Sequence, residues 1–274
     1  MNEKGENLSK EEKKHFWKII GIIKRQSNPD LQIVTIASEI RDSLYEQRLG
    51  KPKSILPILL IFTFCGSGFI LCTILFNNSD YYYFSIILGI TTLTIFLLTY
   101  IWIINANKNL SLFLLIFFVG GTIVYDFLML LPDFEILNEL NKYYILACVP
   151  CFYLYGRLIG GKISGISFDG VTRDVFYLPT LKINYSSYLS AQPPSRQWIF
   201  LCGGLGTVVT SFISSIIVLI IYNDPYLFIF PIFLFIGELL DYSGLAGVLS
   251  GGEFEHLRRE HKIIKDWKNN KFST

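Results

Sequence analysis

The sequence predicts an all-α, multi-pass membrane protein with six transmembrane helices and a small β-like insert between helices four and five. Composition is the first reason: apolar residues make up 51% of the 274 residues, charged residues 17%, and the mean hydropathy is +0.44. Soluble proteins carry roughly 25% charged residues. The second reason is that long apolar runs alternate with short polar breaks, and about 20 apolar residues cross the hydrocarbon core of a bilayer.

The apolar runs define the expected organisation of the chain. The six predicted spans are residues 54–76, 83–105, 110–131, 143–160, 197–221 and 226–249. They divide the chain into an arm (1–53), a three-helix membrane region (54–142), a second membrane region (143–251) that holds the insert 161–196, and a tail (252–274). The first apolar run starts too far from the N-terminus for a cleavable signal peptide. This composition excludes a disordered chain, a disulfide-rich module and an ordinary cytosolic enzyme.

The distribution of Lys and Arg predicts the orientation. With six spans and a cytoplasmic N-terminus, 23 of the 24 Lys and Arg residues fall on the cytoplasmic side, and Lys142 is the exception. Positive residues favour the cytoplasmic flanks of spans. We therefore expect both termini in the cytoplasm, with the protein in a prokaryotic plasma membrane. The net charge of +2 provides no broad basic field, so we expect no nucleic-acid partner.

The arm is predicted to hold two amphipathic helices. Ser9 and Glu12 have the spacing of a capping box, and apolar residues follow at helical spacing from Phe16 to Ile23. A second helix is expected from about Leu31 to Arg48. These helices and the similar tail either lie on the membrane or the core, or form a partner-binding arm. In the tail, Glu-x-x-His spacing from Glu253 to His256 is interpreted as a solvated helix face.

The insert 161–196 contains short alternations of apolar and polar residues, which are strand signals. We expect a cytoplasmic β-like element that packs on the membrane face. Its partly buried residues are expected to be Tyr177, Leu178, Leu181 and Ile183.

Ionisable residues at membrane depth are candidates for a polar site, because each costs at least ~2.5 kcal/mol at a helix centre. Asp126 lies in the third predicted span, and Glu238 and Asp241 share one face of the sixth. Such a face suits a cation or a proton. The alternative is that Glu238 and Asp241 are hydrated near the cytoplasmic end and pair with Arg157 or Lys162.

Small residues and cysteines complete the candidate set. Glycines open the fifth span at Gly203 and Gly204, where close helix packing is the expected role. Cys148 and Cys151 form a C-x-x-C around Pro150, interpreted as small apolar fillers beside a proline. No His falls in a predicted span, and we expect no metal and no cofactor.

The order of these parts resembles the core of the site-2 protease type of intramembrane zinc metalloprotease over about residues 143–255. Gly156-Arg157 with Gly160 resembles the family's small-Arg…Gly element, and Gly203-Gly204-Leu205-Gly206-Thr207 loosely resembles its Gly-Pro-Leu element. Asp241 resembles the Asp that is the third zinc ligand. The H-E-x-x-H slot falls on Cys148, Val149, Pro150, Cys151 and Phe152, which include neither His nor Glu.

The resemblance therefore implies a pseudoprotease, because the two His that bind zinc and the Glu that activates water are missing. We expect a non-catalytic membrane protein that binds or regulates a membrane partner or its transmembrane segment, with a polar site formed by Asp126, Arg157, Glu238 and Asp241. The alternative is a small ion- or proton-coupled transporter that uses the intramembrane carboxylates, although no inverted repeat is visible.

Overall fold

The structure is a computed structural model and is mostly helical. It describes residues 9–26, 29–49, 51–104, 112–113, 116–121, 123–124, 142–173, 179–245 and 252–271. Within these residues, five helical segments are long and apolar enough to cross a membrane. They are α3 (Ile55–Phe76), α4 (Tyr82–Ile104), the segment Tyr144–Ser164 that includes α8 (Val149–Ser164), α10 (Pro193–Tyr222), and the segment Tyr226–Ser243 that includes α11 (Ile229–Ser243).

These segments correspond to five of the six predicted spans. The remaining prediction, 110–131, falls mainly outside the described residues, as does Asp126, so the count of six stays a prediction. Short helical turns complete this part of the chain. They are η1 (Ser79–Tyr81), η2 (Ile116–Gly120), η3 (Lys142–Cys148) and η4 (Tyr226–Phe228).

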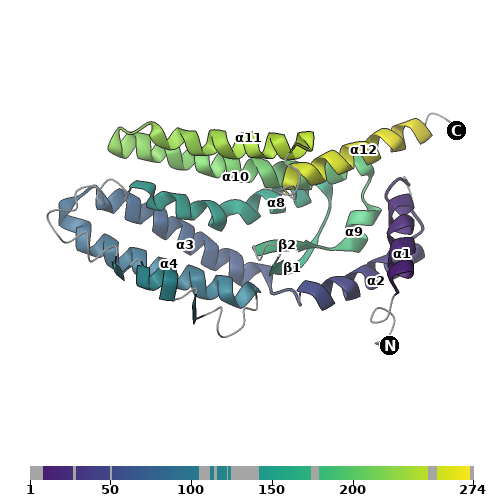
Figure 1. The fold of residues 1–274 in the computed structure, drawn as a ribbon, viewed down its shortest axis with the longest axis horizontal. Coiled ribbons are helices and arrows are strands. Elements are labelled where there is room, and N and C mark those ends of the chain that lie inside the picture. Colours follow the sequence, from purple (N-terminus) through teal and green to yellow (C-terminus); the bar gives the residue numbers. More distant parts are fainter. Residues whose placement is uncertain are drawn as a thin grey trace.

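The long helices run roughly parallel in two groups (Figure 1). α3 packs against α4, α10 packs against α11, and α8 joins the groups by contacting both α3 and α10. The interface of α8 with α10 is the most extensive among the described elements. α12 (Glu253–Lys271) packs along α10 and α11, so the predicted tail belongs to the folded core. Its residues Phe254 and Leu257 are buried.

The N-terminal arm forms α1 (Lys10–Ile23) and α2 (Leu31–Leu49). The predicted capping box is present, because Ser9 Oγ accepts from the Glu12 N–H and the Glu12 carboxylate accepts from the Ser9 N–H. The apolar face of α1 is buried in a cluster that also contains Phe200 from α10 and Leu257 from α12. The arm thus packs on the core, which is one of the arrangements that the sequence left open.

The insert contains a two-stranded antiparallel hairpin and a short helix. β1 (Phe168–Arg173) pairs with β2 (Pro179–Ile183), and α9 (Tyr185–Ser190) follows. Val171 pairs with Leu181 and both are buried, while Ile183 is half-buried. The predicted Tyr177 and Leu178 lie outside the described residues. A predicted β-like element is therefore present; its cytoplasmic position stays a prediction.

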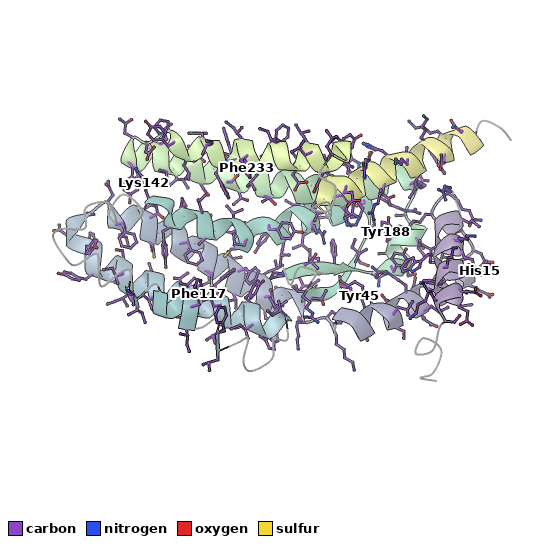
Figure 2. All side chains as sticks on the ribbon, viewed as in Figure 1. His15, Tyr45, Phe117, Lys142, Tyr188 and Phe233 are labelled. Atoms are coloured by element: carbon purple, nitrogen blue, oxygen red, sulfur yellow. The ribbon has the colours of Figure 1, made fainter. Side chains whose placement is uncertain are left out.

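The arm and the hairpin are joined through the backbone. The N–H and carbonyl of Lys53 exchange hydrogen bonds of 2.7 and 2.8 Å with Val171 in β1. Gly170 permits this approach, because a Cβ there would lie 2.5 Å from the Lys53 carbonyl oxygen. Figure 2 shows His15 at the arm end of the molecule and Lys142 at the opposite end. There Lys142 forms an ion pair with Asp224, and the hydrogen bond from Lys142 lowers the pKa of Asp224.

Candidate functional site

Arg157 and Glu253 form a buried ion pair between two helices. Arg157 lies on α8 and Glu253 begins α12, and their side chains are only 13% and 5% exposed. Both Nε and Nη2 of Arg157 contact Glu253 Oε1. The Tyr153 hydroxyl also donates to this oxygen at 2.7 Å, and Arg157 Nη1 donates to the Thr180 hydroxyl on β2. The pair therefore links two helices and the hairpin.

Two glycines of α10 provide the space for this charged cluster. A Cβ on Gly203 would lie 2.9 Å from Glu253 Cδ and 3.1 Å from Arg157 Cγ. A Cβ on Gly204 would lie 2.6 Å from the Phe254 ring and 3.2 Å from Glu238 Oε2. The sequence predicted only close helix packing at this glycine pair. The structure shows that the pair accommodates charged side chains from α8, α11 and α12.

The two carboxylates of α11 point toward the start of α12. Asp241 Oδ2 accepts from the Gly252 N–H at 3.0 Å, and Glu238 Oε2 accepts from the Phe254 N–H at 3.2 Å. The first N–H groups of a helix have no partner within the helix, and its N-terminus favours negative charge. Glu238 and Asp241 thus cap α12 from a neighbouring helix. Sequence reasoning offered Arg157 or Lys162 as their partner; in the described structure Arg157 forms its ion pair with Glu253 instead.

Three residues of the slot of the resembled protease, Cys148, Cys151 and Phe152, are packed against neighbouring segments. Cys148 and Cys151 are buried on α8 or at its start. The Cys148 thiol lies 3.3 Å from the Ser214 hydroxyl on α10, and the Cys151 thiol lies 3.5 Å from the Ala147 carbonyl oxygen. The Phe152 ring packs against Gly66 of α3. Among the described residues, no group of three or more His, Cys, Asp or Glu is arranged to hold a metal ion.

The structure thus brings Arg157, Glu238 and Asp241 into one region between α8, α10, α11 and the start of α12. Asp126, the fourth candidate, lies outside the described residues. Cys148 and Cys151 lie outside this cluster and contact Ser214 and Ala147.

Sequence reasoning missed Glu253 and interpreted its helix face as solvated, and that interpretation is wrong. Glu253, Glu255 and Glu260 are all buried, and the His256 ring stacks on Phe200 at 5.2 Å. Burial lowers the pKa of His256. The available signal was the apolar spacing of Phe254 and Leu257, which places Glu253 close to the buried face.

No family model, no curated protein and no solved structure matches this chain. The resemblance to the site-2 protease type accordingly stays a proposal.

Proposed function

We propose that this chain is a non-catalytic, multi-pass membrane protein with a site-2-protease-like core that binds a membrane partner without cutting it. The observation that carries the proposal is the packing of the slot where the protease would hold zinc. Cys148 and Cys151 are buried; the Cys148 thiol contacts the Ser214 hydroxyl on α10, and the Cys151 thiol contacts the Ala147 carbonyl oxygen in η3. Metal-assisted peptide hydrolysis needs an open coordination position for water.

The packing of the long helices supports the protease-like order of parts. A Cβ on Gly156 would lie 2.3 Å from the Cys202 carbonyl oxygen, and a Cβ on Gly160 would lie 2.4 Å from that of Trp198. α8 and α10 therefore meet backbone to backbone, as small residues permit in membranes. α11, which carries Asp241, packs on α10. The segments that carry the resemblance are thus neighbours around α10.

The surface of α11 supports a partner within the membrane. Only 11% of its span is buried, against 28–44% for the other four candidate spans. Phe233 and Ile236 are exposed on it, together with other large apolar side chains. Exposed apolar surface of this extent faces lipid or a binding partner. We assign to α11 the contact with a transmembrane segment of the partner.

Ion- or proton-coupled transport is the alternative, favoured by one observation: Glu238 and Asp241 are half-buried on a helix long enough to span the membrane. Their contacts weigh against it. Both carboxylates accept hydrogen bonds from backbone N–H groups at the start of α12, so their role in this structure is to cap that helix.

Photocrosslinking tests the proposed function. A photoreactive residue is placed at Phe233 or Ile236 on α11, and at Ile87 on α4 as the control, since all three side chains are exposed. We expect a discrete protein adduct from α11 in native membranes, lost when Ile232 on the same helix is replaced by Trp. Adducts with lipid alone at all three positions would contradict the proposal. Proton flux in proteoliposomes that is lost in Asp241→Asn would favour the transporter.

A further inference from the structure

A cavity of about 560 Å³ lies between the N-terminal arm and the core. Cavities of ~300–1,000 Å³ commonly hold small molecules. Figure 2 shows two of its lining residues, Tyr45 on α2 and Tyr188 on α9, at the arm end of the molecule. The charged residues that line it come from four helices or their ends. They are Lys24, Arg41, Arg157, Arg259 and Glu260.

Lys24 and Arg41 approach the same aromatic ring in this cavity. The Tyr185 ring centroid lies 4.2 Å from Arg41 Cζ and 6.0 Å from Lys24 Nζ. Lys24 follows α1 and Arg41 lies on α2, so packing of the two arm helices brings their charges together. Within the described part of the chain, the Lys24 ammonium makes no hydrogen bond, and its carboxylate neighbour is Glu260 at 4.0 Å.

The cations near the Arg41 side of the cavity have carboxylate partners, whereas Arg196 has no carboxylate within salt-bridge distance in the described structure. Asp42 pairs with Arg41 at 3.2 Å and lies 3.5 Å from the buried Lys182 ammonium, which also has Glu46 at 3.4 Å and Asp169 at 4.0 Å. Arg196 is fully buried, and its three hydrogen bonds in the described structure go to the carbonyls of Lys24, Leu189 and Ala191.

The titration of Lys24 agrees with this charge distribution. Burial lowers its pKa to about 8, and Arg196, Arg41 and Arg259 act in the same direction, while Glu260 opposes them. Burial and the three arginines each disfavour the charged form of Lys24. A bound anion is therefore expected to stabilise the Lys24 ammonium.

Glu260 adds a second requirement on the ligand. Its Oε1 accepts from the Tyr188 hydroxyl, whereas its Oε2 is buried and has no hydrogen-bond partner in the described structure. A buried carboxylate oxygen favours a ligand that also donates a hydrogen bond. A phosphate monoester meets both requirements. It has several acceptor oxygens, and because its second pKa is ~6 it also has a protonated form that donates a hydrogen bond.

We propose that this cavity binds a phosphate monoester or inorganic phosphate, with Lys24 and Arg41 contacting the anion and Glu260 accepting from its hydroxyl. The ammonium acts as a compact charge, and the guanidinium supplies paired N–H groups that match phosphate oxygens. The group has two chemical sources, a lipid headgroup or a soluble phosphate. The proposal does not depend on the proposed function, because it concerns the arm side of the core.

Protection of Lys24 from acylation is the test, with full-length protein in nanodiscs. Three conditions are compared: phosphatidylcholine alone, the same with inorganic phosphate, and the same with phosphatidic acid. Acylation rates of Lys24 are measured by mass spectrometry, with the exposed Lys18 as internal control. We expect inorganic phosphate to protect Lys24 if the source is soluble. If the source is a lipid headgroup, we expect protection by phosphatidic acid alone.

Two arginine variants test whether the protection of Lys24 comes from a ligand in this cavity. Arg41→Gln is expected to weaken the protecting ligand about tenfold, as for loss of one charge-assisted contact. The matched control is Arg25→Gln, because Arg25 pairs with Asp266 and does not line the cavity. Arg259→Gln serves if Arg41→Gln fails to fold, since Arg259 is 60% exposed at the cavity. Equal protection of Lys24 and Lys18, or undiminished protection in both variants, would overturn the proposal.

Discussion

Arg157 and Glu253 are 96 residues apart in the sequence, yet their ion pair fastens α12 to α8 in the interior of the protein. The Tyr153 hydroxyl donates a hydrogen bond to the Glu253 carboxylate, and the Arg157 guanidinium donates one to the Thr180 hydroxyl on β2. Gly203 leaves the space that both side chains occupy. One ion pair therefore joins a membrane helix, the hairpin and the C-terminal helix.

Loss of one member of this pair is expected to be severe. Glu253→Leu leaves the buried Arg157 guanidinium without its carboxylate, and removing one partner of a buried pair costs about 3–5 kcal/mol. Chemical unfolding in detergent measures the loss of unfolding free energy. The double variant Arg157→Met, Glu253→Leu should recover most of it, and Glu39→Leu, at an exposed position of α2, is the control. A single variant as stable as the control contradicts this account.

The glycine pair of α10 is expected to tolerate no side chain. Gly203→Ala places a Cβ 2.9 Å from Glu253 Cδ, so the ion pair must shift, at about 1–3 kcal/mol of unfolding free energy. Gly237→Ala on α11 is the matched control, because a Cβ there has no neighbour within 4 Å. That control should be neutral or slightly stabilising, since Ala favours helix over Gly. Equal effects at the two positions would show that helix propensity alone decides.

Asp241 is expected to act on α12 through its backbone. Asp241→Asn weakens the charge-assisted hydrogen bond from the Gly252 N–H, with a loss of about 1–3 kcal/mol in unfolding free energy while the fold is kept. Hydrogen exchange should accelerate at the first turn of α12 and stay unchanged in α4. Asp80→Asn, at an exposed site in η1, is the control. Unaltered exchange at Gly252 would contradict the capping role of Asp241.

The sequence predicted those features that depend on local pattern. Apolar length located five spans within a few residues, and the spacing of Ser9 and Glu12 predicted the capping box. Alternation in the insert predicted strand structure around Leu181. Glu253 could not be identified in this way, because its burial depends on Arg157 and Gly203, which are distant in sequence. The cavity at Lys24 likewise arises only when the arm packs against α9 and α12.

Topology reporters test the predicted orientation and the number of spans. The distribution of Lys and Arg predicts external fusions at Asn78 and Glu135 and an internal fusion at Asp169. Asn78 and Glu135 together test the number of spans. If both sites lie on the same side of the membrane, an even number of transmembrane helices must separate them. An internal reading at Asn78 would reverse the orientation. A reading at Glu135 opposite to that at Asn78 would remove one of the two crossings that we predict between them.

Because of Lys24, the free energy of unfolding is expected to depend on pH in the alkaline range. Burial, together with the neighbouring arginines, lowers its pKa to about 8 in the folded protein, whereas an unfolded chain keeps it near the usual value of ~10.4. Between these values the unfolded state binds more protons, so stability rises with pH, by at most about 1.4 kcal/mol per pH unit. The useful window is about pH 8 to 9.5, because the pKa values of Tyr185 and Tyr188 are raised by burial and these groups reduce stability above pH ~10. Unfolding at several pH values should show this rise in the native protein and its loss in Lys24→Met.

The acylation rate of Lys24 should reach half its maximum near pH 8 in the absence of phosphate. This midpoint is well below the pH at which the exposed Lys18 reaches half its maximum rate. Coincident profiles for the two lysines would mean that the Lys24 ammonium is solvated and that the arm does not enclose it.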